Sequence, residues 1–550
     1  MSSLGASEWS FTDALDVVTG TVGDREAVAA SGVRRSYREL RDRSNGLARF
    51  LASWGLGLQR ERRGLEPWEL GQSTVGLVMS NCVEYVESML GAYRARAVPV
   101  NVNHHYHPAE VADLLRRLRV GAVIYHRRLG PLLADIETDD LVLIEVDDGS
   151  DEVGLSGRVG YEQAVVPAGS QLSPPSPDDV YLIATGGTTG PPKGVLWRQA
   201  DAFVSAMSGP THATPGQLAQ SVSGPPAIWF APSPLMHAAG QRTVLSCLLR
   251  GGTAIVGDDR ASFDADAILE TAERERVNLM SIVGDAYARR LVESLRTRTR
   301  DLSSLQVLGT GGALMSATMR DEILELLPQV TILDTLSSSE TGAMAQAASQ
   351  KGQAVSFGLT PTAAVLSADR DRVLSPGEDE VGWIARRGRV PLGYLDDPDN
   401  TTRTFPEIDG ERYAVPGDRA RLGADGTIEL LGRDSNVINS GGEKIFAEEV
   451  ENALRAHPGV VDALVVGRPS ERFGTEVVAV VQPRPDFELS AAELREHTAM
   501  LIARFKAPRA VMFCEAVGRL ASGKPDYRWA RDLVAATDPE PASQGVLEPQ

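Results

Sequence analysis

Glycine, threonine and lysine are concentrated in one stretch suited to phosphate chemistry, TGGTTGPPK at residues 185–193, which follows the apolar run 180–184. Glycines let backbone amides approach oxygen atoms closely, threonine hydroxyls donate further hydrogen bonds, and a lysine adds a compact positive charge. The stretch is no Walker A loop, because two prolines separate Gly190 from Lys193. A mobile surface turn and a flexible linker are the alternatives. The candidate phosphate-binding residues are Thr185, Gly186, Gly187, Thr188, Thr189, Gly190 and Lys193.

Carboxylates occur at two later places where they could serve the same ligand. Glu340 lies in DTLSSSETG, just after the predicted strand VTILD, and a cation that bridges phosphates prefers such an oxygen ligand. Asp418 ends YAVPGD, and one carboxylate can accept two hydrogen bonds side by side. Taken alone, Glu340 could be an ordinary solvated carboxylate and Pro-Gly-Asp a simple turn.

The composition restricts where an anionic ligand can bind. The formal net charge is −19, which argues against nonspecific binding to nucleic acid or to an anionic membrane surface. Only five of the 55 basic residues are lysines, so each lysine invites a specific explanation: Lys193, Lys351, Lys444, Lys506 and Lys524. We expect a local positive site to hold any anion.

Other features of the composition bear on location. No apolar run approaches the roughly 20 residues that a membrane span requires. The first residues lack a secretory signal, and three scattered cysteines fit neither a disulfide framework nor a zinc site. We expect a cytoplasmic protein without a membrane span.

The elements that must position these residues alternate between helices and apolar strands. A helical pattern follows Pro108 and precedes VGAVIYH, and the alternation recurs at 265–276 and 321–327. It predicts parallel sheets covered by helices, in which ligands bind at the carboxyl ends of strands. Between about 355 and 430, short segments such as EVGWIARRG, RVPLGY and TIELLG predict antiparallel, barrel-like structure. A compact α+β unit follows from Ser435.

These motifs together resemble the adenylate-forming superfamily of acyl-CoA synthetases, luciferases and peptide-synthetase adenylation domains. The resemblance runs from about residue 14 to 532 and includes YLIATGGTTGPPKG, PSPLMHAAG, GTGGALMS and GRLASGKPDYRWA. It implies an α/β multidomain fold: a large N-terminal domain with helix-covered sheets and a small β-barrel-like subdomain, plus a small mobile α+β C-terminal domain. The expected boundaries are 1–434 for the N-terminal domain, 435–534 for the C-terminal lid, and 535–550 for a disordered tail.

The resemblance also implies roles for individual residues. Thr185 would act with the phosphate loop, His237 would lie beside the acyl pocket, Glu340 would hold magnesium, and Lys524 would be the adenylation lysine. Adenine would pack along Gly311, Gly312 and Ala313, with Asp334 and Leu336 beside it; many relatives have an aromatic residue in place of Leu336. Further nucleotide contacts are implied for Ser339 with phosphate, Asp418 and Arg433 with ribose, and Lys444 with coenzyme A. Ser435 takes the hinge position, where aspartate or lysine is commoner.

The implied reaction joins a carboxylic acid to AMP with release of pyrophosphate, then transfers the acyl group to coenzyme A. Only 26 residues follow Lys524, so we expect no fused carrier domain. GVLWR, VPLGYLDD and NSGGEKIF are most similar to actinobacterial acyl-CoA synthetases of steroid side chains and fatty acids, which suggests a bulky apolar acid, from a steroid or terpenoid or a fatty acid. ATP, Mg²⁺ and coenzyme A are the expected cofactors and co-substrates.

Several alternatives stay open. The chain could adenylate only, passing the acyl group to a carrier protein or second enzyme. It could also be a catalytically silent nucleotide-binding or acyl-binding relative, or an oxygenase of luciferase type. His105 and His107 in NHHYH could bind a metal, although a loop at a strand end is the stronger interpretation. Either a monomer or a homodimer is compatible with the sequence.

Overall fold

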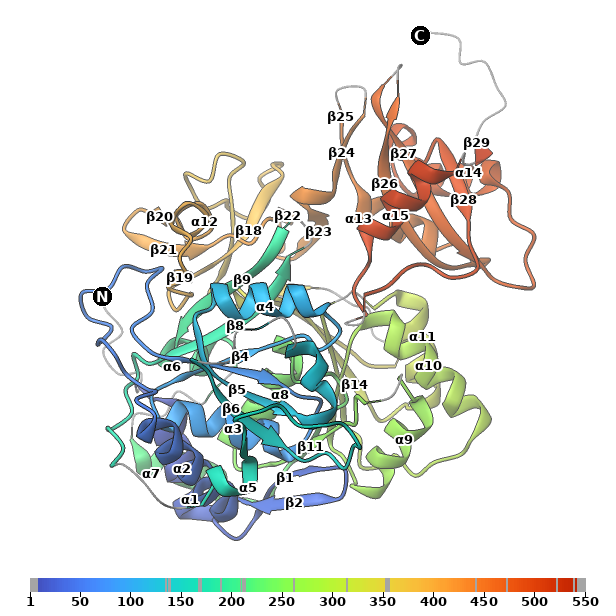
Figure 1. The fold of residues 1–550 in the computed structure, drawn as a ribbon. Helices are drawn as coiled ribbons and strands as arrows, with labels where there is room; N and C mark the ends of the chain where they lie inside the picture. Colours follow the sequence, from blue (N-terminus) through green and yellow to red (C-terminus); the bar gives the residue numbers. More distant parts are fainter. Residues whose placement is uncertain are drawn as a thin grey trace.

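A computed structural model of the chain describes most of its residues (Figure 1). Figure 1 shows a large body built from the first three quarters of the chain and a smaller C-terminal part standing on one side of it. The described residues are 8–133, 136, 140–166, 171–187, 190–207, 209, 214–260, 263–312, 315–351, 357–440, 443–470, 473–520, 523–537 and 540–541.

The large body contains a nine-stranded sheet with the order β16-β15-β14-β13-β12-β10-β11-β1-β2. Six neighbouring strands are parallel, from β14 to β1, and antiparallel strands flank them at both edges. The strands are β1 (Glu26–Ala30), β2 (Val33–Ser36), β10 (Ile228–Ala231), β11 (Thr253–Val256), β12 (Leu279–Ile282), β13 (Val307–Gly311), β14 (Thr331–Ser338), β15 (Gly342–Ser349) and β16 (Gly358–Leu359). Four helices cross between them: α8 (Ala238–Leu249), α9 (Ala265–Arg274), α10 (Gly284–Thr297) and α11 (Ala317–Leu326).

A second sheet is parallel throughout, with the order β4-β3-β5-β6-β7. Its β5 coincides with the predicted strand VGAVIYH, and α4 begins at Pro108 as expected. The strands are β3 (Thr74–Val78), β4 (Val98–Asn101), β5 (Val120–His126), β6 (Val142–Val146) and β7 (Val159–Gly160). The accompanying helices are α1 (Phe11–Val22), α2 (Tyr37–Ser53), α3 (Val83–Arg94), α4 (Pro108–Arg117) and α5 (Tyr161–Ala164). The predicted helix-covered parallel sheets are confirmed.

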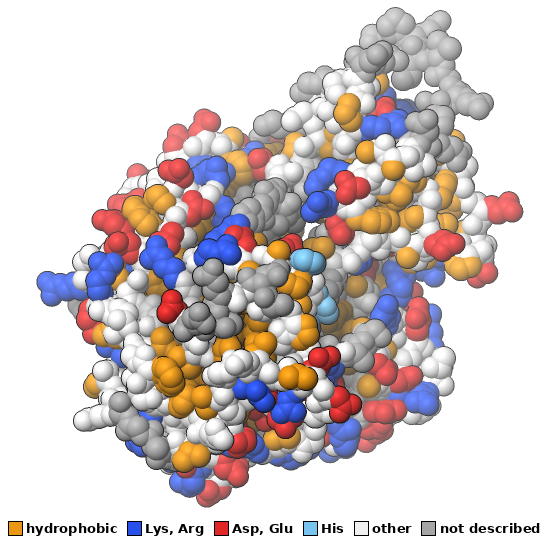
Figure 2. Space-filling model, in the orientation of Figure 1, with side chains coloured by type: hydrophobic (Ala, Val, Ile, Leu, Met, Phe, Trp, Pro, Cys, Tyr) orange, Lys and Arg blue, Asp and Glu red, His pale blue; other side chains and the backbone are white. Residues whose placement is uncertain are grey.

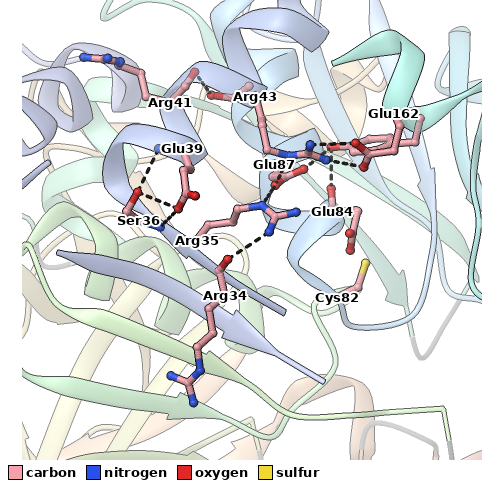
Figure 3. A network of polar contacts seen from close by, with 12 residues as sticks. Arg34, Arg35, Ser36, Glu39, Arg41, Arg43, Cys82, Glu84, Glu87 and Glu162 are labelled. Atoms are coloured by element: carbon pink, nitrogen blue, oxygen red, sulfur yellow. Dashed lines mark hydrogen bonds and ion pairs between the residues drawn. The ribbon is translucent and has the colours of Figure 1, made fainter. Parts of the chain in front are cut away.

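Helices α2, α3 and α5 are joined by ion pairs around Glu87, whose side chain is fully buried (Figure 3). One carboxylate oxygen accepts hydrogen bonds from Arg35 at 3.0 Å and Arg43 at 2.7 Å, and the other accepts one from the Tyr161 hydroxyl at 3.1 Å. Arg43 also binds Glu162 on α5. Burying this carboxylate is tolerated because both of its oxygens are hydrogen-bonded.

Two smaller sheets follow the phosphate-loop segment. The hairpin of β8 (Val180–Gly187) and β9 (Gly190–Arg198) is extended by β19 (Gly393–Tyr394), giving the order β19-β9-β8. RVPLGY forms an antiparallel pairing as predicted, but its strand pairs with β9 and does not join the antiparallel sheet of its neighbours in the sequence. The antiparallel region itself has the order β20-β21-β18-β22-β23, with β17 beside β18. Its strands are β17 (Ala363–Leu366), β18 (Gly382–Arg387), β20 (Glu407–Ile408), β21 (Glu411–Ala414), β22 (Asp418–Leu422) and β23 (Ile428–Arg433).

The C-terminal part combines sheet and helices as predicted. Its four-stranded sheet has the order β26-β27-β28-β29, and its hairpin β24–β25 lies next to β27. The elements are β24 (Val437–Ser440), β25 (Glu443–Phe446), α13 (Ala447–Arg455), β26 (Val460–Ser470), β27 (Gly474–Pro483), α14 (Ala491–Leu501), β28 (Ala510–Phe513), α15 (Tyr527–Ala536) and β29 (Glu540–Pro541).

The boundary expected for the disordered tail, residue 535, lies too early in the chain. Helix α15 continues to Ala536, and β29 pairs antiparallel with β28 because that sheet edge offers free backbone groups. Residues 538–539 and 542–550 lie outside the described part of the chain.

Candidate active site

Glu340 stands at the tip of the turn between β14 and β15, which other segments hold in place. The Trp197 indole donates to the Ser339 carbonyl at 2.9 Å, and Arg242 donates to the Ser338 and Ser339 carbonyls at 2.9 and 3.1 Å. Thr341, fully buried, bonds back to Ser338. Ser339 thus has its backbone fixed, and the half-buried Glu340 carboxylate projects from a turn with few alternative positions.

The Glu340 carboxylate has one hydroxyl partner. Tyr394, on β19, donates to Oε1 at 3.1 Å. Burial, and then the negative charge of Glu340, raises the pKa of the Tyr394 hydroxyl, so it keeps the proton that it donates. Within the described ranges, no arginine or lysine forms an ion pair with Glu340. Its oxygens therefore retain capacity for a cation.

Lys193 lies on the other side of the same tyrosine. Its ammonium is 5.1 Å from the centre of the Tyr394 ring and 3.8 Å from Asp397 Oδ2. Thr185 faces Lys193 across the β8–β9 ladder, and its hydroxyl donates to the Lys193 carbonyl at 3.4 Å. Gly186, Gly187 and Gly190 are strand residues, whereas Thr188 and Thr189 lie outside the described residues. The segment predicted as a loop is largely a hairpin, because the flanking residues continue the ladder.

Asp418 and Arg433 meet where β22 and β23 pair. Arg433 Nε lies 3.3 Å from Asp418 Oδ1. Burial is the main cause that raises the pKa of Asp418, Arg433 opposes it, and the negative charge of Glu340 adds to it. The pKa of Arg433 is raised chiefly by Asp418 and also by Glu340. These shifts place both residues within electrostatic reach of Glu340.

Lys524 reaches this cluster from the C-terminal part. Its side chain is exposed, yet the protein atoms around it, followed by the positive charge of Arg433, lower the pKa of its ammonium, and Glu340 opposes this. A Cβ atom on Gly312 would stand 3.8 Å from Lys524 Cε. The lysine therefore crosses from the smaller part to the glycines at the end of β13.

His237, which is predicted to lie beside the acyl pocket, is the residue immediately before α8. Burial, with Lys524 and His105 as further causes, lowers the pKa of His237 to about 4. Its Nε2 is buried and has no hydrogen-bond partner among the described residues. A neutral imidazole with an unused nitrogen suits contact with a ligand.

The residues predicted to contact adenine differ in burial and in their partners. Gly311 ends β13, and Gly312 has φ +78°, a conformation that favours glycine; Ala313 lies outside the described part. Asp334 is buried and forms an ion pair with Arg320 at 2.9 Å. Leu336 packs against the apolar cluster of Val365 and Ile384.

Two other expectations lie outside this cluster. Lys444 belongs to β25, opposite Asn439, and its side chain is not described. His107 caps α4, where its Nδ1 accepts from Ala109 N at 3.4 Å. The described residues contain no group of three or more histidines, cysteines or acidic residues arranged for a metal ion.

Sequence reasoning assigned no role to Tyr394, Trp197 or Arg242. Tyr394 had a signal, since VPLGYLDD was conspicuous, with one aromatic residue between a glycine and two aspartates. Arg242 had none, because arginine supplies most of the basic residues of this chain. Their contacts span 54 to 142 positions of sequence, which no local pattern reveals.

Comparisons with known proteins agree over most of the chain. A family model described as AMP-binding enzyme matches residues 16–395, and one described as AMP-binding enzyme C-terminal domain matches residues 449–524. The chain is 44% identical over 529 residues to the medium-chain acyl-CoA ligase Mig of Mycobacterium avium, covering 94% of this chain and 96% of that protein. It is 36% identical over 546 residues to a 3-oxocholest-4-en-26-oate–CoA ligase of Rhodococcus rhodochrous, covering 95% of each.

A solved structure gives the same fold. The anthranilate CoA ligase AuaEII in complex with anthranoyl-AMP aligns with a TM-score of 0.79 at 20% identity, covering 96% of this chain and 98% of that chain.

Proposed function

The chain belongs to the AMP-binding enzyme family, and we propose that it is an AMP-forming acyl-CoA ligase for a bulky apolar carboxylic acid. One observation carries the proposal. Lys193, Glu340, Asp418, Arg433 and Lys524 come from widely separated segments, and contacts or mutual electrostatic effects connect them through Tyr394 and Glu340.

In the proposed first step, a carboxylate oxygen of the acid attacks the α-phosphorus of ATP while the bond to pyrophosphate breaks. Lys524 would stabilise the negative charge that gathers between the carboxylate and the α-phosphate. The β8–β9 hairpin with Lys193 and Ser339 would receive the phosphates. Asp418, with Arg433 beside it, would accept the ribose hydroxyls, because a carboxylate can accept two hydrogen bonds. Positioning and charge supply the rate, so no nucleophilic side chain is needed.

Glu340 would hold the Mg²⁺ that accompanies ATP. The fit rests on its open carboxylate oxygens, which receive one hydroxyl hydrogen bond and no ion pair within the described ranges. Hard oxygen ligands of this kind suit magnesium, which would neutralise phosphate charge. Tyr394 would orient the carboxylate, and the turn fixed by Trp197 and Arg242 would limit its movement.

In the proposed second step, the sulfur of coenzyme A attacks the acyl carbon and AMP leaves. The hinge between the two parts would lie at the short turn Asp434–Asn436. The N-terminal domain would then comprise residues 1–434, and the C-terminal domain would begin at residue 435. The relatives' names point to medium-chain and steroid acids, and we propose the same range for this chain. An adenylating enzyme that passes its product to a carrier protein is the second candidate.

Three properties bear on the surroundings of the protein. On the face shown in Figure 2, acidic and basic side chains are interspersed, as expected for a protein that does not bind nucleic acid. No helix in the described residues is long and apolar enough to cross a membrane. All three cysteines are free, which supports the reducing cytoplasm as the proposed location.

The test is acid-dependent release of pyrophosphate from ATP, measured with a panel of fatty, aromatic, steroid and diterpenoid acids. We expect release with at least one apolar acid, dependence on Mg²⁺, and a loss of about 100- to 1,000-fold in Lys524→Ala. Mass analysis after adding coenzyme A or a carrier protein separates the two acceptors. A complete panel without pyrophosphate release would refute the proposal.

A further inference from the structure

The position of Lys524 depends on a tight turn that begins at Arg519. Leu520 N donates to the Lys524 carbonyl at 2.9 Å, and Gly523 N donates to the Leu520 carbonyl at 2.8 Å. Arg519 and Pro525 form an antiparallel bridge across the base of this turn. An interaction that holds Arg519 in place therefore also holds the backbone of Lys524, from which the lysine side chain projects.

Arg519 is fixed by Asp462, at the beginning of β26. Its Nε and Nη2 lie 3.1 and 2.5 Å from Asp462 Oδ2. A second guanidinium, that of Arg455 on α13, lies 3.6 Å from Asp462 Oδ1. Arg455 itself is 3.7 Å from the buried Glu451, whose other oxygen accepts from Val465 N. Asp462 thus connects the lysine turn to the core of the C-terminal part.

The same place touches the large body. The carbonyl of Val461, the neighbour of Asp462, accepts a hydrogen bond of 2.7 Å from Arg289 on α10. At the other end of the turn, a Cβ on Gly523 would lie 3.3 Å from Val283 Cγ1, just before α10. Helix α10 and the residue before it therefore contact the C-terminal part at two places, next to Asp462 and at the lysine turn.

We infer that Asp462 and Arg519 are positioning residues that set the Lys524 ammonium at the site, and that Arg289 holds the C-terminal part in that arrangement. The inference rests on the proposed function and adds residues that do not themselves touch substrate. Because the proposed role of Lys524 is confined to the first step, the three residues should affect adenylation and leave thioester formation alone. Misplacement of a reacting group by about 1 Å can cost about 100-fold in rate.

A purely structural ion pair is the competing interpretation, and it predicts a different pattern. Such a pair would lower stability and reduce both half-reactions in proportion to the folded fraction. A matched control exists in the same sheet, where Arg468 on β26 pairs with Glu476 on β27 at 2.6 Å, away from the lysine turn. Glu476→Gln removes a comparable ion pair without touching the turn.

The experiment measures the two half-reactions separately in the full chain. Exchange of pyrophosphate into ATP reports adenylation, and thioester formation from a supplied acyl adenylate and coenzyme A reports the second step. We expect Asp462→Asn, Arg519→Gln and Arg289→Ala each to lower exchange by about 10- to 100-fold while thioester formation changes less than about twofold. Glu476→Gln should change neither. Equal losses in both steps would overturn the inference.

A readout without turnover keeps the inference separable from the proposed function. Reductive ¹³C-methylation labels the lysines of this chain, of which there are five, and Lys524→Arg identifies the Lys524 signal by NMR. We expect the pKa of labelled Lys524, lowered in the parent protein, to return toward its ordinary value in Asp462→Asn. An unchanged titration would contradict the inference, whereas exchange missing from the parent protein would contradict only the proposed function.

Discussion

Glu87 and Glu340 are both held by an aromatic hydroxyl near arginine side chains, yet they differ in burial and in the number of their partners. Glu87 is fully buried and has two arginines and Tyr161 on its two oxygens (Figure 3). Glu340 is half-buried and, among the residues that the structure describes, receives a hydrogen bond from Tyr394 alone, while Arg433 and Lys524 act on it from beyond ion-pair distance. The difference indicates that a carboxylate whose two oxygens are both hydrogen-bonded stabilises the fold. A carboxylate that lies near cations but keeps free hydrogen-bonding capacity is available to a ligand.

The largest expected effect is the loss of adenylation rate when the carboxylate of Glu340 is removed. Glu340→Gln should lower the rate of adenylation by about 100- to 1,000-fold, because it removes a charge that would hold the metal beside the phosphates. Urea unfolding should show a free energy of unfolding within about 0.5 kcal/mol of the parent protein, as is usual for residues outside such networks. A large loss of stability would erase the contrast with Glu87.

Removing the carboxylate of Glu87 should lower stability and leave the rate of catalysis unchanged. Glu87→Gln should cost about 3 kcal/mol of unfolding free energy, because Arg35 and Arg43 would lose their buried counter-charge. The rate per folded molecule should stay the same, measured after correction for the folded fraction. A selective loss of rate at full stability would show that this region serves catalysis.

The two tyrosines permit a finer comparison by the same substitution. Tyr394→Phe should lower adenylation roughly tenfold, because a charge-assisted hydrogen bond contributes about 1.5–3 kcal/mol and here orients Glu340. Tyr161→Phe should instead lower the unfolding free energy by about 2 kcal/mol. Steady-state rates and chemical unfolding on both variants separate the outcomes, and identical profiles would argue against the distinction.

The smallest effect concerns pH. Crowding lowers the pKa of Lys524, and the reaction requires its protonated form, so activity is present below that pKa and is lost as pH rises through it. The alkaline limb of kcat/KM should therefore fall at a lower pH than an ordinary lysine would give. Lys524→Arg should shift that limb upward, since arginine stays protonated. A limb that is the same in both proteins would assign the titration to another group.

Much of the fold and the order of the motifs could be predicted, because both depend on short stretches of neighbouring residues. The strand at 120–126 and the helix start at Pro108 follow from apolar spacing and a favoured first-turn residue. The roles of Thr185, Glu340 and Lys524 remain predictions, although the structure brings Glu340 and Lys524 within electrostatic reach of each other.

What escaped prediction involves partners far apart in sequence. The ion pair of Arg320 with Asp334, the clamp of Trp197 and Arg242 on the Glu340 turn, and the bond from Arg519 to Asp462 each depend on packed elements. Arginine is so frequent here that its presence at a position carries little information. The pairing of β19 with β9 was missed because a two-residue strand has no periodicity to read.

That pairing has a consequence for how the protein is made. Strand β9 lies between β8, its immediate predecessor, and β19, which comes about two hundred residues later. During translation the hairpin leaves the ribosome long before its third strand exists, so one edge stays uncovered while most of the chain is synthesised. Nascent chains halted before residue 393 should therefore be open to proteolysis at this edge, and those halted well after residue 394 should be protected.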